Sequence, residues 1–169
     1  MMRLVICLVV VCLMACGVYA QNEVLEIGRR APEIALPSPE GEVVKLSSLR
    51  GKLVLVDFWA TWCAPCVEEQ PELEVLYEKY NRADTTTRFE IFGVSLDRSR
   101  DQWIAGIQRL GINWTQVSDL LFWRSPVAND YGIQGLPFNV LVDEQGIIVA
   151  SNLHGVELED FISAYFDYK

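Results

Sequence analysis

Two cysteines separated by two residues are the side chains of this sequence best suited to do chemistry. Cys63 and Cys66 lie in the stretch Trp62-Cys63-Ala64-Pro65-Cys66. This spacing lets both sulfurs reach disulfide distance across the first turn of a helix. Such a pair can pass two electrons by thiol–disulfide exchange, in which one thiolate attacks a disulfide and the second thiol resolves the mixed disulfide. We expect Cys63 to be the exposed attacking thiol and Cys66, one turn deeper, to be the resolving thiol.

The pair has two alternative uses, as a structural disulfide or as half of a zinc site. Zinc needs about four ligands, whereas the folded part has no second cysteine pair and His154 is the only histidine. A static disulfide would close a very small loop and contribute little stability. The spacing therefore favours redox chemistry, with the disulfide itself as the redox group and no metal or other cofactor.

The start of the chain is typical of a secretory signal peptide. Arg3 precedes an apolar run, Leu4–Ala15, that is too short to span a bilayer. Val18 and Ala20 then place small residues at positions −3 and −1 before Gln21, which suits cleavage by a signal peptidase. We therefore divide the chain into a signal peptide, residues 1–20, and one domain, residues 21–169, exported to the periplasm or elsewhere outside the cytoplasm.

A second form of processing stays open. Leu13-Met14-Ala15-Cys16 resembles a lipobox, in which Cys16 would be acylated and would tether the protein to a membrane. In either case Cys63 and Cys66 are the only thiols left in the folded part. A single closely spaced pair differs from a disulfide-stapled exported scaffold, which carries several bridges.

The chain is acidic, with a formal net charge of −9. The acidic residues are spread along the chain, and the charge becomes one unit more negative once Arg3 is removed. Such a domain lacks the basic patch that nucleic-acid binding requires, so we expect no nucleic-acid partner.

The elements around the cysteines must hold the pair where a strand gives way to a helix. Lys52–Trp59 is an apolar run with one acid, which predicts a strand buried on both faces. Apolar residues at helical spacing predict a helix from Ala64 to Tyr80, in which Pro71 would cause a kink. The N-terminus of this helix presents unpaired N–H groups and a partial positive charge, which favour a thiolate at Cys63.

The rest of the pattern predicts an α/β domain. Further strands are predicted at Pro32–Leu36, Glu42–Leu46, Arg88–Leu96, Phe138–Val142 and Ile147–Ser151. Further helices are predicted at Arg100–Leu110, Ser125–Tyr131 and Leu158–Tyr165. This order implies a three-layer α/β sandwich, with a mixed central sheet, helices on both faces and an added N-terminal β-hairpin.

The stretch Val56–Cys66 (VDFWATWCAPC) resembles the active site of the thioredoxin superfamily. The leading segment Ile27–Pro32 and the turn Asp143–Gly146, after a late proline strand, are similar to the TlpA/ResA-like branch of thiol–disulfide oxidoreductases. The resemblance implies a thioredoxin-like fold and thiol–disulfide exchange outside the cytoplasm. It also implies a membrane electron donor of the DsbD or CcdA kind and an oxidised client protein, for which apocytochrome c is one candidate.

Three further positions match the site of this family. Asp57 matches the buried aspartate of thioredoxins, which can take the proton from Cys66. Glu69, three residues after Cys66, matches the active-site glutamate of ResA-like proteins. Pro137 matches the cis-proline opposite the cysteines, which turns the backbone of Leu136 toward an extended substrate.

The sequence departs from the family pattern in two places. Some ResA-like members lack the strand acid, so the division of proton transfer between Asp57 and Glu69 is open. The superfamily often has Thr after the proline, where this chain has Phe138, which alters the substrate groove. The residues expected to contact the substrate are Trp62, Ala64, Pro65 and Leu136.

The residues between the cysteines bear on the direction of electron flow. Strong oxidants carry a histidine there that stabilises the attacking thiolate, whereas Ala64-Pro65 has none and acids lie nearby. We therefore expect a reductant, with a reduction potential closer to that of thioredoxin than to that of DsbA.

Two other functions compete with this interpretation. A peroxiredoxin-like peroxidase would share the leading hairpin, but it needs a hydroxyl residue three positions before the reacting cysteine, where Ala60 precedes Cys63. A Sco-like copper chaperone would use two thiolates and one histidine, but its cysteines are three residues apart. Outside the motif, Trp59, Trp103, Trp114 and Trp123 are expected to pack or to form a local surface, and His154 to be a loop residue without a catalytic role.

Overall fold

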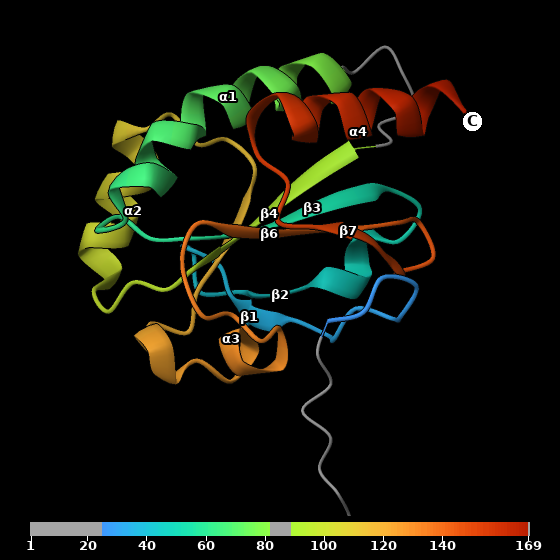
Figure 1. Ribbon diagram of the computed structural model, residues 1–169. Coiled ribbons are helices and arrows are strands. Elements are labelled where there is room, and N and C mark those ends of the chain that lie inside the picture. Colours follow the sequence, from blue (N-terminus) through green and yellow to red (C-terminus); the bar gives the residue numbers. More distant parts are fainter. Residues whose placement is uncertain (1–24, 82–88, 169) are drawn as a thin grey trace, which may run out of the picture.

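The computed structural model describes residues 25–81 and 89–168 (Figure 1). The predicted signal peptide, residues 1–20, and the alternative lipobox at Cys16 lie outside these residues. No helix within the described ranges is long and apolar enough to cross a membrane.

A mixed five-stranded sheet forms the centre of the fold, in the order β5-β4-β3-β6-β7. β3 (Leu53–Trp59) lies in the middle, parallel to β4 (Phe89–Ser95) and antiparallel to β6 (Phe138–Val142). β5 (Thr115–Val117) and β7 (Ile148–Ser151) form the two edges. Every residue of β3 and β4 is buried, as expected of strands that are covered on both faces.

One face of the sheet is covered by the longer helices (Figure 1). These are α1 (Ala64–Tyr80), α2 (Arg100–Arg109) and α4 (Gly155–Asp167). Their core cluster includes Leu55 of β3, Trp103 of α2 and Ile162 of α4. Because α1 begins just after the end of β3, this face carries the strand–helix junction that holds the cysteines.

The opposite face is covered by a β-hairpin and a short helix (Figure 1). The elements are β1 (Ala35–Pro37), β2 (Val43–Lys45) and α3 (Pro126–Asp130), with the 3-10 turns η2 (Leu46–Leu49) and η3 (Phe122–Arg124). The rings of Phe58 and Tyr131 meet in this second core with their centroids 5.1 Å apart. The fold is therefore the predicted three-layer sandwich with an added N-terminal hairpin.

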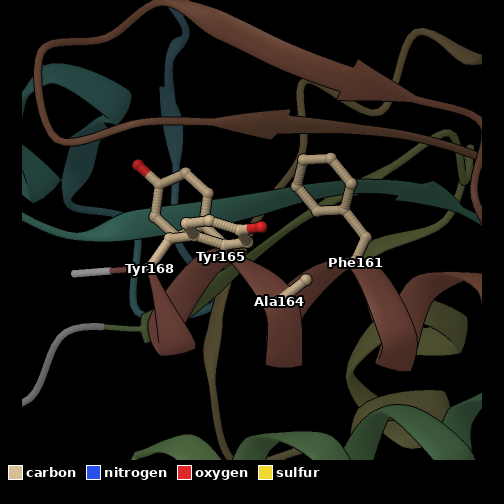
Figure 2. A pocket seen from close by; sticks show the side chains of 4 residues that line it. All are labelled: Phe161, Ala164, Tyr165 and Tyr168. Carbon is tan, nitrogen blue, oxygen red and sulfur yellow. The ribbon is translucent and has the colours of Figure 1, made fainter.

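The C-terminal half of α4 carries an aromatic surface of its own. A shallow pocket there is lined by Phe161, Ala164, Tyr165 and Tyr168 (Figure 2). It lies at the end of the molecule away from the start of α1 (Figure 1), and so does not belong to the cysteine site.

Candidate active site

Cys63 and Cys66 form a disulfide, with their Cα atoms 5.3 Å apart. Cys63 is the N-cap of α1, and its Sγ accepts the backbone N–H of Cys66 at 3.3 Å. The sulfur of Cys63 thus lies at the positive end of the helix, where unpaired N–H groups and the helix dipole stabilise a thiolate.

Cys63 is more enclosed than expected from the sequence. It is 5% exposed, against 1% for Cys66. Cys63 is therefore the more accessible of the two cysteines, as predicted, but it is not exposed in the disulfide form. Both cysteines belong to the core cluster beneath α1, and Leu136 packs against this cluster. Ala64 and Pro65 are exposed, so the side of the pair that faces solvent is at the N-terminal end of α1.

Asp57 lies within β3, and its side chain points toward the face covered by α1. It lies two residues from both Leu55 and Trp59 along the strand, so it shares the face on which these two residues belong to the core. Asp57 is 2% exposed. Burial raises the pKa of Asp57 to about 7, with the negative charge of Glu69 as a second cause and a hydrogen bond from Gln70 opposing the rise. A carboxyl group of this kind can take up and release a proton near neutral pH.

Gln70 links the strand acid to the turn that carries the resolving cysteine. It is 2% exposed, and its Nε2 donates a hydrogen bond to the backbone oxygen of Cys66 at 3.2 Å. Its amide also lowers the pKa of Asp57 against the effect of burial, so Gln70 acts on the strand acid as well as on the turn of Cys66. Gln70 was not among the site residues predicted from the sequence, although its place four residues after Cys66 puts it on the same side of the helix.

Glu69 and His154 meet across the helical layer. The side chain of Glu69 is 11% exposed, and its Oε1 lies 2.8 Å from Nδ1 of His154. His154 immediately precedes α4, as its N-cap residue. His154 was predicted to be a loop residue without a catalytic role, because 85 residues separate it from Glu69 and no local pattern indicates the contact.

Asp97 fixes the loop that precedes Cys63. Its buried carboxylate accepts the backbone N–H of Thr61 at 3.2 Å, the hydroxyl of Thr61 at 2.6 Å and the hydroxyl of Ser95 at 2.7 Å. Gly106 of α2 makes room for this loop, since a Cβ there would lie 2.4 Å from Cγ2 of Thr61. The sequence analysis missed both Thr61 and Asp97. The available signal was a Ser-x-Asp pattern at the end of an apolar strand.

The Leu136–Pro137 peptide bond is cis and lies just before β6. Leu136 packs against the cluster that contains both cysteines. Phe138 packs instead toward Phe58, with the ring centroids 6.5 Å apart, on the side of the sheet covered by the hairpin. The predicted contact residue Leu136 therefore packs against the core cluster that includes both cysteines, whereas Phe138 packs on the other side of the sheet.

An aromatic rim, formed by Trp62, Phe122 and Trp123, lies beside the cysteines. The Trp62 ring lies 5.0 Å from that of Phe122 and 6.2 Å from that of Trp123. Trp62 is 47% exposed and Trp123 is 40% exposed, whereas Trp59, Trp103 and Trp114 are buried. The guanidinium of Arg98 covers the ring of Phe122 at 4.0 Å. The sequence analysis did not connect η3 with the cysteines, which lie about sixty residues earlier.

Comparisons with known proteins cover this whole region. Residues 27–151, which include both cysteines, match the AhpC/TSA family. The thiol-disulfide oxidoreductase ResA of Bacillus thuringiensis is 28% identical over 149 residues, which cover 88% of this chain and 82% of ResA. The thioredoxin-like protein YneN of Bacillus subtilis is 30% identical over 131 residues, covering 77% of this chain and 74% of YneN. The crystal structure of the thioredoxin domain of a thiol-disulfide oxidoreductase from Bacteroides vulgatus aligns with a TM-score of 0.77 and 35% identity, covering 83% of this chain and 98% of that chain.

Proposed function

This chain belongs to the AhpC/TSA family and is a ResA-like thiol–disulfide oxidoreductase of the thioredoxin superfamily, and we propose that it reduces protein disulfides outside the cytoplasm. In this proposal the redox group is the Cys63–Cys66 disulfide, and the reaction needs no other cofactor. The observation that carries the proposal is the position of this pair at the N-terminus of α1, beneath which lies Asp57, a buried acid with a pKa of about 7.

The reaction needs two exchanges. In the reduced protein the Cys63 thiolate attacks one sulfur of a client disulfide, the client S–S bond breaks, and the released sulfur leaves as a thiolate. Asp57 then takes the proton of Cys66, and the Cys66 thiolate attacks Sγ of Cys63. The mixed disulfide breaks, and the second client sulfur leaves as a thiolate that takes up a proton. The client has gained two electrons, and the protein is left as the Cys63–Cys66 disulfide.

The reducing direction is supported by the charges around the pair. Ala64-Pro65 offers no cation to stabilise the attacking thiolate, while Asp57 and Glu69 are acids on the same face of the sheet. Negative charge near the thiols disfavours the thiolate, hence the reduced form, and so lowers the reduction potential. A membrane electron donor of the DsbD or CcdA kind would return the disulfide to the dithiol.

The client is proposed to bind around the exposed end of the pair. Its contacts would be Trp62, Ala64, Pro65 and Leu136, extended by Phe122 and Trp123 of the aromatic rim. An extended client segment would pair with the backbone before Pro137, where the cis bond lies. The client would be an oxidised protein, and apocytochrome c is a candidate suggested by the family resemblance.

The location outside the cytoplasm is supported by the start of the sequence. Residues 1–20 have the composition of a signal peptide, and Cys16 would add a membrane tether if it were acylated. An exported reductant with one redox pair fits a compartment in which protein disulfides form and persist.

A peroxidase or a copper chaperone has less support. Ala60, three residues before Cys63, cannot supply the hydroxyl group that peroxide chemistry needs. Among residues 25–81 and 89–168, no group of three or more His, Cys, Asp and Glu side chains is arranged to hold a metal ion. Peroxidase activity that persisted in Cys66→Ser without an added thiol would favour the peroxidase instead.

Trapping of clients tests the proposal. In Cys66→Ser the resolving thiol is absent, so Cys63 of the exported full-length protein should retain clients as adducts that disappear on reduction. The double variant Cys63→Ser/Cys66→Ser is the matched control and should retain none. If Cys63 of Cys66→Ser can be alkylated but captures no protein, the proposed reduction of protein disulfides is contradicted.

A further inference from the structure

The ring of His154 contacts an acceptor at each nitrogen. Nδ1 lies 2.8 Å from Oε1 of Glu69, and Nε2 lies 3.2 Å from Oδ1 of Asn152. The contact with Glu69 is partly shielded from water, since the two side chains are 34% and 11% exposed. A carboxylate and an amide oxygen both accept hydrogen bonds, so the ring can donate to both only when both nitrogens carry hydrogen. A ring that carries hydrogen on both nitrogens can therefore bind Glu69 and Asn152 at the same time.

The loop that carries His154 is anchored to the neighbour of the strand acid. Asn139 pairs with Asp57 across β3 and β6. The side chain of Asn139 donates to the backbone oxygen of Leu153 at 2.6 Å and accepts its N–H at 3.1 Å. The backbone N–H of Asn152 also donates to the backbone oxygen of Asn139 at 2.8 Å. The ring is therefore held close to the site by contacts that do not depend on Glu69.

We propose that His154 is a positioning residue of the redox site, which as a cation fixes the Glu69 carboxylate and offsets its negative charge beside Asp57. The inference rests on the proposed role of Asp57 as the base for Cys66. Glu69 raises the pKa of Asp57, so a cation paired with Glu69 limits that rise. Without the cation, Asp57 would hold its proton more tightly and would be a poorer base at neutral pH.

The groups around this pair are consistent with a cation at His154. Glu69 lies on α1, Glu72 of the same helix lies close to Gly155, and Glu157 is in the first turn of α4. These acids oppose the N-terminus of α4, which disfavours a positive charge. The groups that face Asp57 are Glu69 and Gln70 from α1, Asn139 from β6 and Gly93 from β4. Of these four, Glu69 alone carries a charge.

The pKa of Asp57 in the oxidised protein, measured by carboxyl carbon NMR, tests the inference without a client or a titrating thiol. His154→Gln should raise this pKa by about one unit, because it keeps a hydrogen-bonding side chain but removes the charge. His154→Lys, which keeps the charge, should restore a value close to that of the wild type. In the Glu69→Gln background, His154→Gln should have no further effect.

Lys79→Gln is the matched control. Lys79 and Glu159 form an exposed ion pair, 2.8 Å long, between the same two helices, so this variant removes the same charge far from Asp57. It should leave the pKa of Asp57 unchanged. Any of three results would overturn the inference. The pKa of Asp57 could stay unchanged in His154→Gln, it could shift equally in His154→Lys, or the shift could persist in the Glu69→Gln background. A failure of client trapping would overturn only the proposed function.

Discussion

Asp57 and Asn139 are direct neighbours across β3 and β6, yet the amide of Asn139 is bound to the backbone of Leu153 rather than to the acid. Among the described residues, no hydrogen-bond partner reaches Oδ2 of Asp57. A second donor would stabilise the carboxylate and lower its pKa. Because Asn139 is engaged elsewhere, burial dominates and the pKa of Asp57 rises to about 7.

This raised pKa should make the stability of the oxidised protein depend on pH. The pKa rises from 3.8 to about 7, so between these values the folded protein holds a proton that the unfolded chain has released. The free energy of unfolding should therefore fall as the pH rises, by about 3 kcal/mol between pH 5 and pH 8 from this group. Asp57→Asn should remove this part of the fall in urea unfolding. An equal fall in both proteins would show that Asp57 is not the group responsible.

Asp57→Asn should also slow the second exchange. An asparagine cannot take the proton of Cys66, so its attack on a mixed disulfide at Cys63 should be about a hundredfold slower at neutral pH. Stopped-flow release of a coloured aromatic thiol from Cys63 measures this step. The control is Glu68→Gln, which changes an exposed acid on α1, the helix that carries Cys66. This variant should react at the wild-type rate. A wild-type rate in Asp57→Asn would remove Asp57 from the mechanism.

The loop before Cys63 should loosen when its anchor is removed. Thr61→Val keeps the shape of the side chain but loses the hydroxyl bond to Asp97 at 2.6 Å. We expect a loss of about 1–3 kcal/mol in the free energy of unfolding, because a buried acceptor loses a partner. Urea unfolding measures this loss, and Thr61→Ser, which keeps the hydroxyl, should recover most of it. Wild-type stability in Thr61→Val would mean that this bond does not hold the loop.

The aromatic rim should matter for protein clients and not for small disulfides. Trp123→Ala removes a half-exposed ring beside Trp62 and should lower kcat/KM for a protein disulfide about tenfold, as a typical interface anchor does. The rate with a small disulfide such as oxidised glutathione should stay the same. Val156→Ala, an exposed apolar position on α4, is the control. If Trp123→Ala lowered kcat/KM equally for both substrates, the variant would act on the reactivity of the cysteines and not on client binding.

The sequence was most informative where a local pattern sufficed. The helix predicted at Ala64–Tyr80 has these bounds in the structure, because its apolar spacing continues through Pro71. The buried strand with one acid, Asp57, is β3. The edge strand β5, at Thr115–Val117, was not predicted, because three residues are too few to show an alternating pattern.

The parts of the site that were missed depend on contacts distant in sequence. Thr61 and Asp97 meet across 36 residues, and Glu69 and His154 across 85. Trp123 reaches Trp62 only because η3 packs beside the start of α1. Nothing in the local sequence distinguishes Trp123 from a tryptophan that packs in the core. Tertiary packing determines which residues meet at the site, whereas hydrophobic periodicity in the sequence indicates only the structure of a single helix or strand.

The reduction potential of the Cys63–Cys66 pair decides whether the pair acts as a reductant. The protein can be equilibrated with dithiothreitol or glutathione buffers, and its dithiol fraction counted by alkylation and mass spectrometry. We predict a potential near that of thioredoxin, about −270 mV. A potential above about −150 mV, close to that of DsbA, would contradict the account.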